Sequence, residues 1–297
     1  MITAEQISEI RSFSRQARRD GQRIGLVPTM GALHQGHLRL VKQMRKHADR
    51  VVVSIFVNPT QFGPGEDFEA YPRQLQQDLE QCRRAGADAV FCPKKESVYA
   101  AEHFIRLRLQ TLGERLCGAR RPGHFDGVIQ VVNKLLNIVQ PDVAIFGQKD
   151  IQQYRILEQM VAEFNHDVAL IMASTVRAGD GLALSSRNAY LSREERAKAP
   201  ALYGSLVKLR HELLSKLLPP AAPQTDAQQL IDARLHQTAE ELNAAGLRTD
   251  YIELVDYERL QPVVSSLKPE SRYLLAAAVY LGKARLIDNL IIETGRT

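Results

Sequence analysis

The segment at 51–57, VVVSIFV, constrains the fold more than any other part of the chain. β-branched and aromatic residues favour strands, and this run shows almost no alternation between apolar and polar side chains. A strand of this kind is typical of a parallel sheet that is covered on both faces. Further short apolar runs alternate with helical patterns over the first two-thirds of the chain, and this alternation predicts a mostly parallel α/β sheet.

The alternation also predicts the individual elements of a Rossmann-like, doubly wound domain. Thr3 followed by Gln6 resembles a capping box that starts a first helix, and Gly21 ends that helix. Strands are expected at 24–27, 51–57, 87–92, 143–146 and 168–173. The later helices of this domain are expected at about 36–48, 73–85, 127–139 and 151–164.

The last third of the chain has a different pattern. Ser192 and Glu195 form a capping-box pattern before a long helix, and a proline-rich run at 219–223 interrupts the chain. A second helix is expected to end before Gly246, and three strand-like runs follow, at 250–255, 273–280 and 285–292. We therefore predict a second, smaller α+β domain. The predicted domains are 1–175 and 176–297.

Charge is spread unevenly along the 297 residues. The whole chain has 39 basic and 34 acidic residues, but residues 1–150 carry 22 basic and 16 acidic ones. We therefore expect an anionic ligand in the first half. The contents of hydrophobic residues, 44%, and of charged residues, 25%, are typical of a globular protein and exclude a fibrous or largely disordered chain.

The cysteine pattern and the length of the apolar segments predict where in the cell the protein is found. Cys82, Cys92 and Cys117 are an odd number without CxxC spacing, which predicts buried, reduced thiols rather than a disulfide or metal framework. No run approaches the ~20 apolar residues of a membrane span, and the first residues lack the pattern of a secretory signal. A cytoplasmic protein without a membrane partner is therefore expected.

The segment PTMGALHQGH, at 28–37, carries the strongest functional signal. It lies between a predicted strand and a predicted helix, where open α/β sheets bind ligands. Gly31 and Gly36 allow close approach of the backbone, and the helix start is expected to offer free N–H groups to phosphate. His34 and His37 are three residues apart, so both rings are expected on one face of the first helical turn. There they would stabilise charge that develops during attack at phosphorus.

A single histidine in such a place is more often an ordinary exposed loop residue. Two histidines at this spacing, between a strand and a helix, favour a catalytic pair instead. The segment matches neither the Walker A loop nor the GxGxxG fingerprint, and this mismatch disfavours P-loop kinases and NAD enzymes.

Several motifs together resemble a known family. HxGH is the signature of the nucleotidyltransferase and class I aminoacyl-tRNA synthetase superfamily. VNPTQF (57–62), YPR (71–73), RPGHF (121–125), GQKD (147–150) and DGLALSSRN (180–188) occur in the order and spacing of the pantoate–β-alanine ligases. The resemblance implies ATP-dependent condensation of pantoate with β-alanine to pantothenate. A pantoyl adenylate would form with release of pyrophosphate, and the amine would then displace AMP. ATP, pantoate and β-alanine are the implied small-molecule partners, and a homodimer is the implied assembly.

The resemblance also assigns residues. Catalysis falls to His34, His37 and Lys149, with His37 as the family's proton donor. Adenylation needs no obvious proton transfer to pyrophosphate, so the chemistry favours electrostatic stabilisation by both rings. Gln61 and Gln153 would contact pantoate, and Gln61 would also contact β-alanine. The implied ATP-binding residues are Met30, Gly31, Ala32, Leu33, His34, Gln35, Gly36, His37, Gly147, Gln148, Lys149, Asp150, Val176, Leu184, Ser185, Ser186 and Arg187.

Residue types agree with several of these roles. Lys149 falls between a predicted strand and a predicted helix, where an ammonium would meet phosphate, although an exposed loop lysine is the plainer interpretation of its position alone. Asp150 would cap the next helix or hold a ribose hydroxyl. Two hydroxyls and a guanidinium at 185–187 suit a pyrophosphate leaving group. Arg121 and His124 are further candidates for contact with phosphate or pantoate.

Magnesium is the expected cofactor. It accompanies ATP and is usually held by one or two carboxylates plus phosphate oxygens. Asp78, in the helix after YPR, is the family's candidate ligand. Relatives often have an acid just before it, where this chain has Gln77. A solvated carboxylate on a helix face is the competing interpretation of Asp78.

Two other functions remain open from the residues alone. An adenylyltransferase of the same superfamily would keep the nucleotide in its product, and HxGH and the segment at 185–187 fit it equally well. The context of Gln61 and Gln153 and the second domain do not favour it. An RNA-binding protein is suggested only by a pI near 9.1. No RNP, KH or zinc-knuckle pattern supports it, and an aromatic content of 6% without tryptophan leaves few platforms for stacking bases. We therefore predict no nucleic-acid partner.

Overall fold

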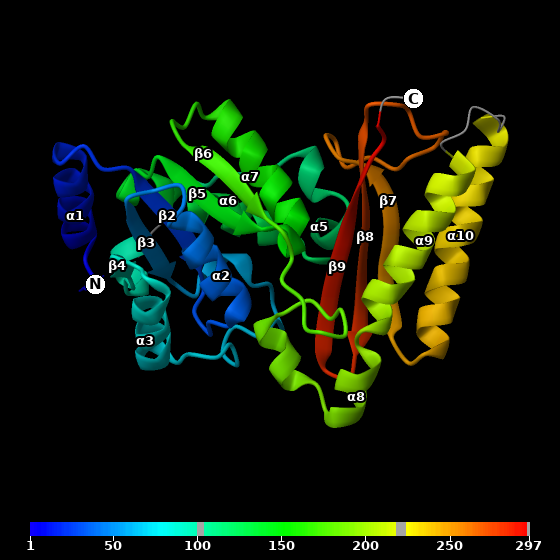
Figure 1. Cartoon of the computed structure of the whole chain (residues 1–297), viewed down its shortest axis with the longest axis horizontal. Helices are drawn as coiled ribbons and strands as arrows, with labels where there is room; N and C mark the ends of the chain where they lie inside the picture. The colour runs from blue at the N-terminus through cyan, green and yellow to red at the C-terminus, as the bar shows by residue number, and fades with distance from the viewer. Residues whose placement is uncertain (100–103, 218–223, 296–297) are drawn as a thin grey trace. The chain divides into compact units, whose positions relative to one another are not determined.

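The computed structural model describes residues 1–99, 104–217 and 224–295, and the chain divides into two compact units (Figure 1). The first unit comprises Met1–Gln110, Arg121–Gln148 and Gln152–Val176. The second comprises Thr111–Arg120, Lys149–Ile151 and Arg177–Thr297. The proline-rich run predicted at 219–223 lies outside the described residues.

The first unit is built on a six-stranded sheet in the order β1-β4-β3-β2-β5-β6, and all its strand pairs are parallel. Its strands are β1 (Ile2–Ala4), β2 (Ile24–Thr29), β3 (Arg50–Ile55), β4 (Ala89–Phe91), β5 (Val143–Gly147) and β6 (Ala169–Ala173). Strand order runs outward in one direction from β2 to β4 and in the other from β5 to β6. The switch point is therefore between β2 and β5, where ligands of doubly wound sheets bind beyond the carboxyl ends of the strands.

Helices cover both faces of this sheet. They are α1 (Ile7–Arg19), α2 (Gln35–Met44), α3 (Leu75–Ala85), α6 (His124–Val139) and α7 (Ile151–Glu163), with a short α4 (Lys95–Val98). Val27 and Val53 belong to the apolar cluster that includes α2 and α3. The alternate residues Leu26 and Val52 point to the opposite face, and all four are 0% exposed. The absence of alternation in the sequence thus reflects burial on both sides, and the predicted Rossmann-like doubly wound sheet is confirmed.

The start of the chain differs from the prediction. Thr3 does not cap a helix but lies in β1, an edge strand that pairs with β4. The first helix begins at Ile7, and its reciprocal capping box joins Gln6 and Glu9. A three-residue strand is too short to show a period in the sequence, so the capping pattern of Thr3 and Gln6 was misleading.

The second unit contains a three-stranded antiparallel sheet of β7 (Arg248–Asp256), β8 (Arg272–Leu281) and β9 (Ala284–Glu293). Its helices are α5 (Leu116–Arg120), α8 (Arg193–Lys198), α9 (Ala201–Leu217) and α10 (Gln224–Ala244). A leucine stripe on α9 packs into the core of this unit: Leu202, Leu206, Leu209, Leu213 and Leu217. The predicted small α+β architecture and the capping box of Ser192 and Glu195 are both confirmed.

The predicted state of the cysteines is also confirmed. All three thiols are unpaired and buried. Burial raises the pKa of Cys82 to about 12, because the thiolate would lie among apolar side chains and near the carboxylate of Asp78. Over the described part of the chain, no helix combines the length and the apolar character needed to cross a membrane.

Candidate active site

The loop that joins β2 to α2 is the centre of the candidate site in the first unit. Two consecutive residues in it have left-handed backbone conformations, Gly31 with φ +79° and Ala32 with φ +48°. Glycine is required at position 31, because a Cβ there would lie 2.9 Å from Oδ2 of Asp78 and 3.2 Å from Cγ2 of Ile55. Ala32 has a left-handed backbone conformation that residues other than glycine rarely adopt, so the surrounding contacts must stabilise this conformation.

Backbone N–H groups in this loop have partners within the chain. Gly31 N–H donates to Oγ1 of Thr29 at 3.2 Å, and the N–H groups of Ala32 and Leu33 each donate to the carboxylate of Asp78 at 2.9 Å. These three N–H groups are therefore not available to a ligand. At the start of α2, where free N–H groups were predicted, the N–H of Gly36 also has a partner, Nδ1 of His34, so the prediction is wrong for Gly36. The competing interpretation of Asp78, a solvated carboxylate on a helix face, is wrong too, since that residue is 1% exposed.

The two histidines at the start of α2 hold each other in place. His34 is the N-cap, and its Nδ1 accepts a hydrogen bond from Gly36 N–H at 3.1 Å. Nδ1 of His37 accepts from the backbone N–H of His34 at 3.4 Å. The ring centroids are 4.1 Å apart, which confirms that the rings share one face. Because a backbone N–H can only donate, each neutral ring carries its proton on Nε2.

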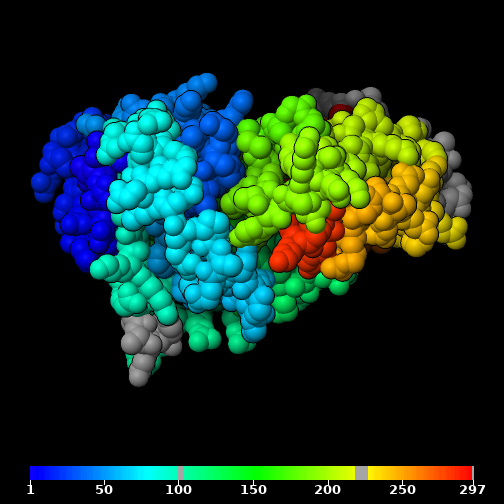
Figure 2. Space-filling model, turned by 90° about the horizontal axis from the view of Figure 1, so that it is seen from below, coloured from blue at the N-terminus to red at the C-terminus, as the bar shows by residue number. Residues whose placement is uncertain are grey.

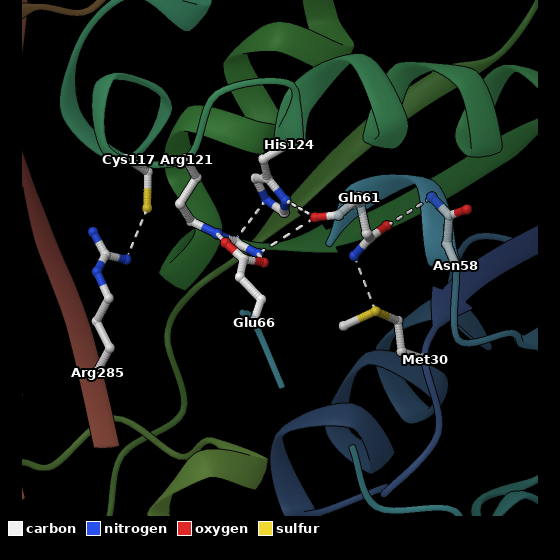
Figure 3. Close-up of polar contacts among 8 residues, drawn as sticks. All are labelled: Met30, Asn58, Gln61, Glu66, Cys117, Arg121, His124 and Arg285. Carbon is white, nitrogen blue, oxygen red and sulfur yellow. Dashed lines mark hydrogen bonds and ion pairs between the residues drawn. The ribbon is translucent and has the colours of Figure 1, made fainter. Parts of the chain in front are cut away.

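Gln61 is held at both ends of its side chain, as Figure 3 shows. Its Nε2 donates to Sδ of Met30 at 3.0 Å, and its Oε1 accepts from Nδ2 of Asn58 at 3.1 Å. Gln61 ends a short 3-10 helix, η1 (Pro59–Gln61), and is 8% exposed. The contact with Met30 connects Gln61 directly to the β2–α2 loop.

Asn58 is the N-cap of η1 and fixes that segment against α6. Its Nδ2 also donates to the carbonyl of Gly127 at 3.0 Å, and its Oδ1 accepts from the hydroxyl of Tyr99 at 2.8 Å. Gly127 lies so close to η1 that a Cβ on it would be 2.2 Å from the carbonyl oxygen of Thr60. A glycine in the first turns of α6 is therefore what allows η1 to approach.

Two further side chains, those of His124 and Arg121, reach the backbone carbonyl of Gln61, and Glu66 holds Arg121 (Figure 3). Nδ1 of His124 lies 2.7 Å from the carbonyl oxygen of Gln61, and Nη1 of Arg121 lies 2.9 Å from Nε2 of the same ring. Arg121 also forms two hydrogen bonds to Glu66, at 2.7 and 2.5 Å. Burial raises the pKa of Glu66, but the hydrogen bond and the charge of Arg121 outweigh burial and leave the pKa below its usual 4.5.

The second unit carries Lys149 and Asp150. They follow β5 in a short 3-10 helix, η3 (Gln148–Asp150), and their side chains form an ion pair with a distance of 3.4 Å between Nζ and Oδ1. The backbone carbonyl of Lys149 accepts a hydrogen bond from Nδ2 of Asn289 at 3.0 Å. Asn289 lies in β9 and is 2% exposed, so a buried amide positions the lysine backbone.

The serine–arginine segment lies in the same unit. Ser185 is the N-cap of a 3-10 helix, η4 (Ser186–Tyr190), and its hydroxyl accepts from the N–H of Arg187 at 3.3 Å. Asn188 donates to the carbonyl of Ala183 at 3.0 Å and so closes the turn around Leu184. These bonds make the segment an ordered turn that presents hydroxyls and a guanidinium.

Comparison with known proteins decides the family. A family model described as pantoate-beta-alanine ligase matches residues 2–291. The chain belongs to the pantoate–β-alanine ligase family. The pantothenate synthetase of Fervidobacterium nodosum is 48% identical over 293 residues, which cover 99% of this chain and 100% of that protein. The pantothenate synthetase of Stutzerimonas stutzeri is 48% identical over 296 residues, which cover 99% of this chain and 98% of that one.

Solved structures agree with this assignment. Pantothenate synthetase from Thermus thermophilus has a TM-score of 0.84 and 40% identity, and the match covers 98% of this chain and 99% of that one. The pantoate–β-alanine ligase from Francisella tularensis, solved in complex with beta-gamma ATP and β-alanine, has a TM-score of 0.75 and 33% identity. That match covers 98% of this chain and 97% of the other. This chain is therefore an enzyme, a pantoate–β-alanine ligase that forms pantothenate.

The predicted ligase residues fall on both units. The first unit brings together Met30, the loop through His37, and Gln61, while Gly147 ends β5 in the same sheet. Gln148, Gln153 and Val176 also belong to the first unit, at the start of η3, in the first turn of α7 and beyond β6. Lys149, Asp150 and the residues at 184–187 belong to the second unit. Ligand contacts of these residues stay predictions.

Sequence reasoning missed the residues that support this ligase site. Asn58 had a readable signal, because an Asn followed by a proline is a common start for a helical turn. Gly127, Glu66 and Asn289 had none, since their importance depends on segments that are distant in the sequence.

Proposed function

We propose that this ligase works in two chemical steps. A carboxylate oxygen of pantoate attacks the α-phosphorus of ATP, and pyrophosphate leaves with the electrons of the broken P–O bond. The amine of β-alanine then attacks the acyl carbon of the pantoyl adenylate, AMP leaves, and the amine loses a proton. The Francisella relative, which was solved with beta-gamma ATP and β-alanine, supports ATP and β-alanine as substrates.

The observation that carries this proposal is the paired arrangement of His34 and His37. Both rings carry a proton on Nε2 when neutral, and they lie beyond the end of β2 at the switch point of the sheet. Two N–H donors on one face suit the charge that grows on the phosphate oxygens during attack. We propose electrostatic stabilisation by both rings, with Lys149 and the segment at 185–187 binding the phosphates.

Gln61 is proposed to bind pantoate and, later, β-alanine. An amide both donates and accepts, which suits a substrate with hydroxyl and carboxylate groups. Gln153 is proposed as the second contact with pantoate. The fixed position of the Gln61 side chain supports this role, because a held amide loses little freedom when it binds a ligand.

Magnesium is proposed to enter with ATP, held by phosphate oxygens. The described residues contain no group of three or more His, Cys, Asp and Glu side chains that would hold a metal ion. The one carboxylate that was predicted as a ligand, Asp78, is 1% exposed and faces the N–H groups of the β2–α2 loop, so it is not accessible to a metal ion and does not fit that role. A homodimer and a cytoplasmic location also stay predictions.

Isotope exchange between pyrophosphate and ATP tests the proposal. We expect exchange that depends on pantoate, followed by release of AMP when β-alanine is added. Replacing both rings, in H34A/H37A, should lower the exchange rate by at least about a thousandfold, given a cost of about 10²–10³ for each lost donor. Circular dichroism and the melting temperature confirm that the variant is folded. Wild-type turnover in this variant, or a product that retains the nucleotide, would contradict the proposal.

A further inference from the structure

We propose that Asp78 is a positioning residue that holds the β2–α2 loop and does not ligate magnesium. The consequence for catalysis rests on the proposed function, but the structural role does not. Asp78 lies in the first turn of α3, and the outer surface of this helix forms part of the exterior of the first unit (Figure 2, cyan). Its side chain points inward and is 1% exposed.

Both carboxylate oxygens are engaged by the loop. Oδ2 accepts from the N–H of Ala32 and Oδ1 accepts from the N–H of Leu33, each at 2.9 Å, and Gln74 Nε2 lies 3.4 Å from Oδ1. Successive N–H groups in a turn form a concavity that binds anions. Here the bound anion is the carboxylate of Asp78, a side chain of the protein itself.

The conformation of the loop explains why such an anion is needed. Gly31 and Ala32 are consecutive left-handed residues, and the second has a side chain that disfavours this conformation. The two charge-assisted hydrogen bonds compensate for that preference. The next residue after Leu33 is His34, the N-cap of α2, so the carboxylate of Asp78 determines where the histidine pair begins.

A carboxylate has about four lone-pair sites, so the two N–H bonds alone would not exclude a metal. Burial excludes it, because Asp78 is 1% exposed and Ala32 and Leu33 beside it are 7% and 5% exposed. A magnesium ion with its phosphate or water ligands would reach the carboxylate only if the loop moved away, and the N–H donors of Ala32 and Leu33 would then lose their acceptor. Gln77, the preceding residue, is exposed, so it lies on a different side of α3 from Asp78. The observed contacts therefore favour a permanent internal partner for Asp78.

Hydrogen exchange of the wild-type protein tests this directly. The amide hydrogens of Ala32 and Leu33 are measured by NMR in buffer, with magnesium chloride alone, and with magnesium and ATP. We expect both amides to be protected in buffer and to exchange no faster in either other condition. Faster exchange on addition of magnesium would mean that the carboxylate leaves the loop for the metal, and it would overturn the proposal. This measurement needs no turnover, so it separates the proposal from the proposed reaction.

The isosteric variant D78N supplies a second test. Its amide has one acceptor oxygen, so one of the two N–H bonds is lost. We expect exchange at Ala32 or Leu33 to accelerate by about tenfold or more, and kcat to fall by about tenfold or more. The magnesium concentration for half-maximal activity should stay within about twofold, because no ligand of the metal is removed. A rise in that concentration with unchanged exchange would overturn the proposal.

The control is E80Q, which removes a carboxylate on the outer face of the same helix. Glu80 forms ion pairs with Arg83 and Arg84 of α3, at 2.7 and 2.9 Å. We expect wild-type exchange at Ala32 and Leu33 and wild-type kcat in this variant. If D78N does not fold, the wild-type exchange measurement still decides between the two roles.

Discussion

The imidazole of His124 donates from Nδ1 to the backbone carbonyl of Gln61, and its Nε2 accepts from Arg121. These directions follow from the partners, because a carbonyl oxygen can only accept and a guanidinium can only donate. The two ring nitrogens therefore face different partners, a carbonyl at Nδ1 and a guanidinium at Nε2. Glu66, Arg121 and His124 thus form a chain of contacts that ends on the backbone of the residue proposed to bind pantoate.

Replacing Glu66 tests this chain of contacts. In E66Q the guanidinium of Arg121 loses its charged partner, so Arg121 and His124 hold the carbonyl of Gln61 less firmly. We expect kcat/KM for pantoate to fall by about three- to tenfold, the equivalent of about one hydrogen bond. Steady-state kinetics measure the change, and E69Q, which removes an exposed carboxylate three residues away, serves as the control. Equal losses in both variants would show that the contact chain has no specific role.

A second prediction concerns the close approach of η1 to α6. In G127A the new methyl group overlaps the backbone of Thr60, so η1 must move and Gln61 moves with it. We expect a loss of about 1–3 kcal/mol in the free energy of unfolding and a rise in KM for pantoate. The control is G204A on α9, where a Cβ meets nothing within 4 Å. There, alanine should stabilise the protein by about 0.5–1 kcal/mol. A stabilised G127A with normal KM would contradict the packing argument.

Asn289 gives a third prediction. In N289A the carbonyl of Lys149 loses the buried amide that positions it, 140 residues away in the sequence. We expect pantoate-dependent exchange between pyrophosphate and ATP to slow by about tenfold, from the loss of one buried hydrogen bond. If Asn289 were only structural, the melting temperature would fall and the exchange rate at a permissive temperature would match wild type. The two readouts together therefore distinguish positioning of Lys149 from general stability.

These contacts show what the sequence predicts and what it does not. The order of strands and helices could be predicted from the sequence. Burial on both faces removes the alternation of apolar and polar residues in strands such as β3, and a capping box such as Ser192 with Glu195 depends only on residues close together in the sequence. The closeness of His34 and His37 was readable for the same reason, since three residues in a helical turn fix it. The partner of the loop N–H groups was not readable. Asp78 is more than 40 residues away from the loop in the sequence. In the sequence it cannot be told from a carboxylate on the solvent-exposed face of a helix.

The last prediction concerns pH and lies outside the active site. Burial lowers the pKa of His166 from its usual 6.5, and Nε2 of the ring lies 2.8 Å from Oδ1 of Asn133. Near pH 6 the unfolded chain therefore binds more protons at this position than the folded protein does. The contribution to stability is fully present above pH 6.5 and is lost as the pH falls through the lowered pKa of the folded state.

We expect the melting temperature of wild type to fall more between about pH 7.5 and pH 5.5 than that of H166Q, whose amide keeps a donor for Asn133 but does not titrate. Thermal unfolding at both pH values measures the difference, and equal falls in the two proteins would show that His166 is not the group responsible.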